Sequence, residues 1–290
     1  RLGRDGHLEV PVTHLVPAEV MGSGLGSPTS HTGDYDIQMF DEEVVAEIAA
    51  QARQQEDTWI EAEATVLRAE VEDRMGRSEL AQGHYHAAFS RAIESGHSQV
   101  MAQVCIGLLW NDDPQDGIED VMRWLGKGQA AVSRLGDDPE LQSRLLNAAG
   151  YAMYRRRYHD EAKSTLLNAL NRSEDVFGPN HPALAEPLSG LGQTLAAQGN
   201  LDEAQRIFER ALRLAQREFG VDHPNYGAAA ENLGAVLAQR RRYDTALERM
   251  REALAIKEAR LGRDHPRVAI SNRNIASVLH QLGRNAEALP

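Results

Sequence analysis

The chain has 290 residues, of which 42% are hydrophobic and 26% are charged, and its formal net charge at pH 7 is -12. This acidic balance argues against nucleic acid as a partner, because contacts to phosphates depend on clustered lysine and arginine side chains. No run approaches the roughly 18 apolar residues of a membrane span, and the start carries no signal-peptide core. A single cysteine, Cys105, excludes an internal disulfide and fits a reducing compartment, so we expect no membrane contact and a cytoplasmic location.

Residues 1–38 combine turn-forming residues with isolated apolar ones, which predicts a flexible linker or tail. The spacing of three glycines in this segment, Gly22, Gly24 and Gly26, suggests a phosphate-binding loop. The Lys-Ser or Lys-Thr pair of such a loop does not follow them, so we favour the linker. Because the chain opens on Arg1 and stops within a repeat, we expect it to be a fragment of a longer protein.

Residues 39–137 are expected to form irregular hairpins related to the later repeats, because apolar residues recur at spacings of three and four without a strict longer period. A turn is expected at 83–88, where Gly-His-Tyr-His resembles the start of a second helix. The twelve carboxylates of residues 41–79 are interpreted as a solvated helical face. Helices are expected over 42–54, 58–81, 98–109 and 117–135. The expected buried side of the last hairpin consists of Trp110, Met122, Trp124 and Leu125.

From residue 138 onward the sequence repeats with a period of 42 residues. A fixed period of this size indicates a solenoid, in which each unit buries its apolar face against a neighbour. The recurring small residues are Gly150, Gly192 and Gly234 in one set and Ala162, Ala204, Ala246 and Ala288 in another. First helices are expected near 140–155, 182–198, 225–240 and 267–282. Second helices are expected near 159–176, 201–218 and 243–260, with a truncated one after Asn285.

A connector of the form Gly-x-Asn/Asp-His-Pro separates successive repeats. Its glycine is expected to take the left-handed conformation that ends a helix, and its proline to fit the first turn of the next helix. The residue before the histidine is predicted to cap that next helix, as Asp138 is for the first repeat. The predicted caps are Asn180, Asp222 and Asp264. The histidines lie one per repeat, too far apart to share a metal ion, so we assign a connector role to His181, His223 and His265.

The positions within each repeat resemble those of the tetratricopeptide repeat (TPR) family. The pattern of its first helix is present as Leu188, Leu191, Gly192 and Leu195, and that of its second helix as Ala204, Phe208 and Ala211. The resemblance implies an all-α, right-handed α-solenoid with four TPR units over 138–290, the last one truncated. The 42-residue period is similar to the kinesin-light-chain type of repeat, which also occurs in bacterial signalling proteins.

The resemblance also implies a protein or peptide partner, held in a concave groove that the first helices line. The implied groove residues are Arg144, Asn147, Tyr151, Tyr154, Glu186, Ser189, Gln193, Glu231, Asn232, Arg273, Asn274 and Ser277. Asn232 and Asn274 match an asparagine that the family uses to hold the backbone of an extended peptide. Glu186 and Glu231 would favour a basic residue in the middle of that peptide. The alternative, that these positions are only polar and solvent-facing, stays open.

No catalytic, cofactor-binding or metal-binding motif is recognisable. Cys105 lies in an apolar run and is expected to be an inert packing residue, whereas His84 and His86 are expected at the surface. We therefore expect a non-catalytic scaffold for protein interactions. Two alternatives stay open. The segment resembles the helical tail of bacterial serine/threonine kinases, so it would be a sensing or autoregulatory arm of a kinase or NTPase. Its truncated C-terminal end would also favour self-association.

Overall fold

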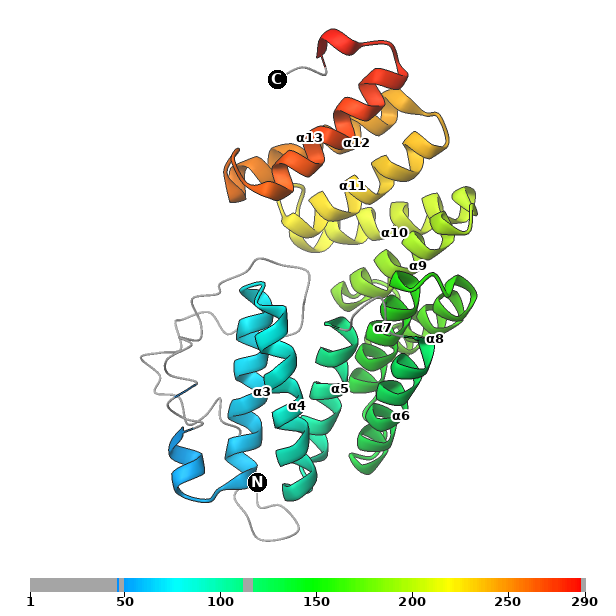
Figure 1. Cartoon of the computed structure of the whole chain (residues 1–290). Coiled ribbons are helices and arrows are strands. Elements are labelled where there is room, and N and C mark those ends of the chain that lie inside the picture. The colour runs from blue at the N-terminus through cyan, green and yellow to red at the C-terminus, as the bar shows by residue number, and fades with distance from the viewer. Residues whose placement is uncertain (1–45, 47–49, 112–116, 288–290) are drawn as a thin grey trace. The chain divides into compact units, whose positions relative to one another are not determined.

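The computed structural model of the chain describes residues 46, 50–111 and 117–287, and the regular elements in these ranges are all helices (Figure 1). This confirms the predicted all-α fold class. None of the described helices has the length and apolar character needed to cross a bilayer. The predicted linker, with Gly22, Gly24 and Gly26, lies outside the described residues.

The described chain divides into two compact units, and the point of division along the sequence falls inside one helix. Unit 1 ends at Ala152 and unit 2 begins at Met153. The dividing helix is α7, Pro139–Arg155, which begins as predicted at Asp138. The Asp138 carboxylate accepts hydrogen bonds from the backbone N–H groups of Glu140 and Leu141 at 2.9 and 3.0 Å.

Unit 1 contains two helical hairpins before α7. Its helices are α3 (Thr58–Arg74), α4 (Ser78–Ser95), α5 (Ser98–Trp110) and α6 (Ile118–Arg134). Helix α4 packs against both α3 and α5, and α5 packs against α6. The last hairpin was predicted at almost the same residues, so its position is confirmed.

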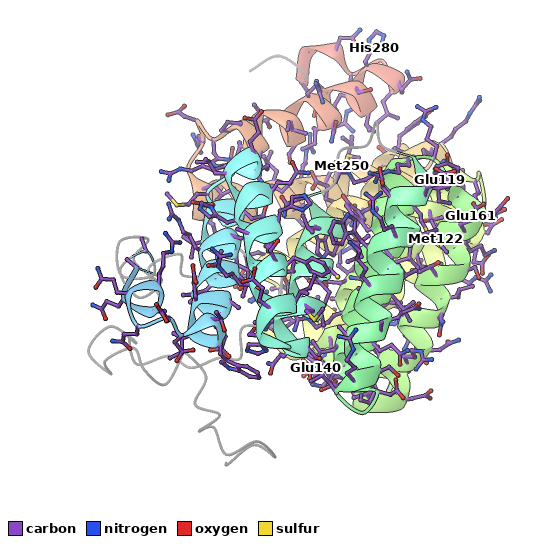
Figure 2. All side chains as sticks on the ribbon, turned by 60° about the horizontal axis from the view of Figure 1, so that its bottom comes forward. Glu119, Met122, Glu140, Glu161, Met250 and His280 are labelled. Atoms are coloured by element: carbon purple, nitrogen blue, oxygen red, sulfur yellow. The ribbon has the colours of Figure 1, made fainter. Side chains whose placement is uncertain are left out.

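Two of the wrong expectations for unit 1 concern the position of a turn and the buried side of a helix. The turn expected at 83–88 lies inside α4, and the chain breaks instead at Gly76, which has a φ of +73°. Gly83 does not interrupt α4, because Ala81, Tyr85 and Ala88 bury a continuous face of that helix. In α6, Trp124 and Leu125 are buried as expected, but the side chain of Met122 is 52% exposed, at the position that Figure 2 labels.

Unit 2 is a series of helices that pack in sequence order, each against the next (Figure 1). Its full helices are α8 (His159–Phe177), α9 (Ala185–Ala197), α10 (Leu201–Phe219), α11 (Pro224–Gln239), α12 (Tyr243–Leu261) and α13 (Pro266–Gln281). A 3₁₀ turn, Pro182–Leu184, precedes α9, and another, Asn285–Glu287, follows α13. The helices predicted from the 42-residue period are therefore confirmed to within about three residues.

The recurring glycines allow the two helices of a repeat to approach closely. A Cβ atom added at Gly192 would lie 2.6 Å from the ring of Phe208 in α10. At Gly234 it would lie 2.8 Å from the side chain of Met250 and 3.1 Å from the carbonyl oxygen of Ala246. Any larger residue would force these helices apart, so the repeat glycine is required by packing.

The connectors between repeats differ from the sequence-based expectation in their capping residue. The N-cap is the histidine: Nδ1 of His181, His223 and His265 accepts a hydrogen bond from the backbone N–H two residues later, at 3.1–3.2 Å. The predicted caps Asn180, Asp222 and Asp264 are exposed instead. The following proline occupies the first helical turn, as predicted. The histidine takes the capping role because it stands immediately before that proline.

The connector glycines have positive φ, as predicted, but they are not left-handed helical. Gly178, Gly220 and Gly262 have φ of 80–84° and ψ of 158–172°. This region is essentially restricted to glycine. A second positive-φ position lies in the turn between the two helices of each repeat. Its occupants are Arg157, Gly199, Arg241 and Gly283.

Candidate functional site

The predicted groove residues of α7 are less accessible than the sequence suggested. Asn147 is only 3% exposed, so its amide is not presented at the surface. Tyr151 is half-buried, and its ring lies 4.9 Å from that of Trp110 in unit 1. Tyr154, at the start of unit 2, lies 5.9 Å from the ring of His159. Arg144 is also partly buried.

Three of the predicted groove residues meet in unit 2. The hydroxyl oxygen of Ser189 in α9 accepts hydrogen bonds from Nε2 of Gln193 and from Nδ2 of Asn232, both at 3.2 Å. Gln193 lies one turn along the same helix, whereas Asn232 reaches across from α11. We call Ser189, Gln193 and Asn232 the amide cluster. It joins the first helices of two consecutive repeats through side chains that are only partly buried.

Glu231 has a different environment from the one expected. One carboxylate oxygen accepts a hydrogen bond from Lys257 Nζ at 2.6 Å, and the other accepts one from the hydroxyl of Ser271 at 2.8 Å. Lys257 comes from α12 and Ser271 from α13. The charge of Glu231 is thus balanced by a lysine of its own repeat. The carboxylate stabilises the contact between repeats, and we no longer assign it to an incoming basic residue.

The first helix of the last repeat presents the remaining predicted residues. Arg273 and Ser277 are exposed on α13, and Asn274 is partly exposed. Within the described part of the chain, Arg273 makes no ion pair. Ile270 lies one turn before Arg273 and is 48% exposed. This arrangement places an apolar side chain beside an unpaired guanidinium.

Sequence reasoning missed three exposed residues of these first helices. Ala228 and Ala235 are exposed on α11, and Ile270 is exposed on α13. The groove residues were those that the family resemblance implied, and Ala228, Ala235 and Ile270 were not among them. The 42-residue period held the missing signal: Ala228 and Ile270 occupy the repeat position of Glu186, and Ala235 that of Gln193.

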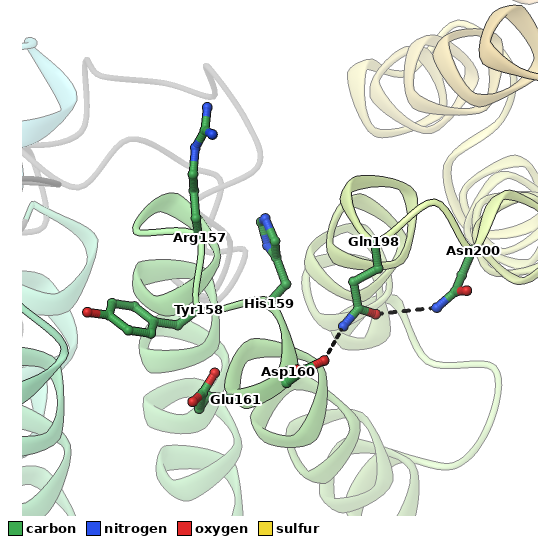
Figure 3. Close-up of a pocket in the computed structure, with 7 residues that line it drawn as sticks. All are labelled: Arg157, Tyr158, His159, Asp160, Glu161, Gln198 and Asn200. Carbon is green, nitrogen blue, oxygen red and sulfur yellow. Dashed lines mark hydrogen bonds between the residues drawn. The ribbon is translucent and has the colours of Figure 1, made fainter.

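A shallow pocket of about 550 Å³ lies at the helix–helix turns of the first two repeats of unit 2 (Figure 3). A hydrogen bond of 2.7 Å from Gln198 Nε2 to the Asp160 carboxylate crosses it. One repeat later, the residues at the equivalent positions are Arg240 and Asp202, which form an ion pair. Two repeats later they are Arg284 and Asp244, which form an ion pair at 3.5 Å. The same contact therefore recurs at successive turns, which indicates that these residues link repeats together.

Unit 1 buries several ionisable groups that the sequence placed at the surface. Glu61 and Glu72, expected on a solvated face, are 6% and 1% exposed. His84 Nδ1 lies 2.6 Å from Glu72 Oε2, so this histidine is not a free surface residue. Burial opposes the charged form of Glu61, but hydrogen bonds from Arg53 and Arg91 outweigh it and lower the pKa of the carboxyl. These groups are satisfied by their partners and stabilise the fold.

The described residues offer little for catalysis. Cys105 is buried, as predicted, and burial raises the pKa of its thiol to about 12, so the nucleophilic thiolate is suppressed. Among the described residues, no group of three or more histidine, cysteine, aspartate or glutamate side chains is arranged to hold a metal ion. The predicted groove residues of unit 2 offer hydrogen bonding through amides and hydroxyls, and a charged guanidinium at Arg273.

The sequence pattern of the tetratricopeptide repeat matches residues 141–217, 186–259 and 228–290, which together span more than half of the chain. A second pattern, the C-terminal part of a domain of unknown function (DUF4438), matches residues 2–58. No protein of curated function matches the chain.

Several solved structures share the fold. A putative kinesin light chain of Podosopora anserina with nearly identical TPR-like repeats is 17% identical, with 66% of this chain and 89% of that chain covered and a TM-score of 0.52. A Rap protein complexed with Competence and Sporulation Factor is 15% identical, with 85% and 76% covered and a TM-score of 0.59. A signal-transduction ATPase (STAND) of Pyrococcus horikoshii with a TPR sensor is 15% identical, with 87% and 42% covered and a TM-score of 0.58. At these identities the similarity establishes the fold alone.

Proposed function

Because the chain belongs to the tetratricopeptide repeat family, we propose that it is a non-catalytic scaffold that binds an extended segment of another protein. The binding surface lies on the first helix, or helix A, of each repeat in unit 2. We call it the helix-A face and define it as the amide cluster together with Arg273, Asn274 and Ser277. These residues lie on α9, α11 and α13, the first helices of three consecutive repeats.

The observation that carries the proposal is the amide cluster itself. Asn232 and Gln193 both direct an NH₂ group to the Ser189 hydroxyl, which holds their side chains in place before any partner arrives. A primary amide has two donors and an acceptor, so each side chain keeps capacity for the N–H and C=O groups of an extended backbone. Ordered side chains lose less entropy when a partner binds.

The neighbouring residues indicate what kind of segment would fit. Ala228 and Ala235 are small and exposed on α11, so they leave room for the partner's side chains. On α13, Ile270 offers an apolar contact and Arg273 an unpaired guanidinium, which is suited to a carboxylate. We therefore propose a segment with an apolar residue close to an acidic one. The Rap protein of the same fold, which was solved with Competence and Sporulation Factor, supports peptide recognition as the mode of binding.

The affinity for one short peptide is expected to be micromolar, about -8 kcal/mol. The surface is open, so much of the interaction energy is offset by the entropy that the peptide loses on ordering.

The test is a selection from a library of random peptides on the intact chain, followed by titration of the selected peptides. Replacing Asn232→Ala and Asn274→Ala together should weaken their binding by about tenfold or more. The matched control is Asn168→Ala with Asn171→Ala, which removes two exposed asparagines from the second helix α8 and should change nothing. Equal binding by both double variants would show that the segment binds elsewhere.

A second candidate function is that this chain is part of a larger signalling enzyme and uses the same surface there. The fold similarity to the STAND ATPase with a TPR sensor favours it. In that case the helix-A face would receive a segment of the parent protein or of its activator. Reading the gene around this segment for a kinase or NTPase domain would test the idea, and the absence of both would contradict it.

A further inference from the structure

A cluster of cations around aromatic rings lies on α4 and α6 of unit 1, outside the surface considered so far. Lys127 Nζ lies 4.2 Å from the centre of the Trp124 ring and 4.8 Å from that of Phe89. The guanidinium carbon of Arg123 lies 5.8 Å from the Trp124 ring, and the His86 ring lies 5.6 Å from it. We call these five residues the cationic patch.

Lys127 differs from the other two lysines of the chain. Lys163 and Lys257 each pair with a glutamate, Glu203 at 3.7 Å and Glu231 at 2.6 Å. Lys127 has no carboxylate partner among the residues that the structure describes, and its ammonium group lies over two aromatic rings. A ring face attracts an ammonium group without cancelling its charge. The ammonium is therefore held in a fixed position, and its charge remains available to an anion.

The field around Lys127 is positive. Burial lowers the pKa of His86, and the charges of Lys127 and Arg123 lower it further, so the positive charge of the patch at neutral pH comes from Lys127 and Arg123. One carboxylate, that of Asp120, pairs with Arg123 in the same turn of α6. The side chains of Arg123, Lys127 and His86 are all exposed, whereas Trp124 and Phe89 are buried beneath them.

Two glycines beside the patch have no packing role. A Cβ atom at Gly83 in α4 or at Gly126 in α6 would meet nothing within 4 Å. In the hairpin of α5 and α6, by contrast, a Cβ atom at Gly107 or Gly128 would lie 2.4–2.6 Å from a core side chain. Glycine in a helix interior is unfavourable by about 0.5–1 kcal/mol relative to alanine. Exposed glycines at these two places leave the helix backbones open to close approach by another chain.

We propose that the cationic patch is a second interaction site, which binds an acidic segment of a partner protein. Two adjacent cations, Arg123 and Lys127, fit one or two carboxylates, and the 52% exposed Met122 beside them fits an apolar neighbour. A phosphate-covered surface requires more contacts than this patch provides. The site does not depend on the helix-A face.

The probe is a fluorescein-labelled peptide, Glu-Glu-Leu-Glu-Glu-Leu, titrated against the whole chain at low salt. The double variant Arg123→Gln with Lys127→Gln should bind it about tenfold more weakly. The matched control, Arg206→Gln with Arg213→Gln, removes two exposed arginines from α10 and should bind it like the unaltered chain. The same peptide with glutamine in place of glutamate should not bind. Similar melting temperatures exclude unfolding as the cause.

Three results would overturn the proposal. The acidic peptide would fail to saturate the unaltered chain below about 1 mM, or it would bind both double variants equally. The third such result is that vesicles of phosphatidylcholine and phosphatidylserine bind to the chain through Arg123 and Lys127 whereas the peptide does not bind. The titration is repeated in the Asn232→Ala, Asn274→Ala background, which weakens the helix-A face. The loss caused by Arg123→Gln with Lys127→Gln should persist there, so failure here and failure of the helix-A face are distinguishable.

Discussion

The histidine caps make a sharp prediction about stability, and His223 is the best place to test it. Its Nδ1 accepts the backbone N–H of Asn225 at 3.1 Å, and its ring stacks on Phe219 with the ring centres 4.3 Å apart. Loss of an N-cap costs about 1 kcal/mol, and an aromatic stack contributes about 0.5–1 kcal/mol more. His223→Ala should therefore lower the stability of unit 2 by about 1–2 kcal/mol, or roughly 2–8 °C in melting temperature.

The same cap depends on pH in a definite direction. Nδ1 can accept a hydrogen bond only while the ring is neutral. Burial lowers the pKa of His223 below its ordinary value of 6.5, and the charge of Arg260 lowers it further. A depressed folded-state pKa means that the unfolded chain takes up the proton first. The contribution of His223 is thus present above pH 6.5 and is lost as the pH falls below it.

Thermal unfolding followed by circular dichroism, at about pH 7.5 and about pH 5.5, distinguishes the loss of the cap by mutation from its loss by protonation of the histidine. His223→Asn should keep most of the stability, because asparagine is a good N-cap, and should lose less of it on acidification. Asp222→Ala removes the cap that the sequence suggested and should change stability by less than about 0.5 kcal/mol. If Asp222→Ala destabilised the protein more than His223→Ala, the assignment of the cap to the histidine would be refuted.

Further predictions concern packing, backbone strain and the thiol. Gly192→Ala should cost about 1–3 kcal/mol, because its Cβ would lie 2.6 Å from Phe208. Gly83→Ala, in open space, should stabilise by up to about 1 kcal/mol. Equal melting temperatures for Gly192→Ala and Gly83→Ala would contradict the assignment of these glycines to a packed and an open helix position. Arg241 has a φ of +60° at the position where Gly199 and Gly283 stand, so Arg241→Gly should raise stability by about 0.5–1 kcal/mol in urea unfolding, and a loss would contradict this. Cys105, with a pKa of about 12, should resist Ellman's reagent in the native protein and react once in guanidinium.

The repeats of unit 2 were predictable because their signals are local and periodic. Glycine, alanine and proline at fixed spacing define helix ends and close helix approaches, and the structure begins and ends its helices almost where they indicate. The cap was assigned wrongly because histidine is not among the common N-cap residues. Its ring nitrogen nevertheless reaches the N–H groups in three successive connectors.

The polar contacts were not predictable, because they join residues far apart in the sequence. Glu72 meets His84 across 12 residues, and Glu63 meets His97 across 34. No local pattern distinguishes such paired carboxylates from solvated ones. For the candidate site the limit was of another kind. The groove positions implied by the family resemblance included Glu231, whose charge Lys257 balances, and left out Ala235, which is exposed.

The central claim, that the helix-A face of unit 2 receives a partner segment, is tested most directly by site-specific photo-crosslinking with a selected peptide. A photoreactive phenylalanine derivative would replace Ala235 on α11 in one variant and Ala255 on α12 in the other, since both alanines are exposed. Ala235 lies one turn from Asn232, whereas Ala255 lies on a second helix. We expect the peptide to crosslink at position 235 and not at position 255. Crosslinking at 255 alone, or equally at both, would contradict the account.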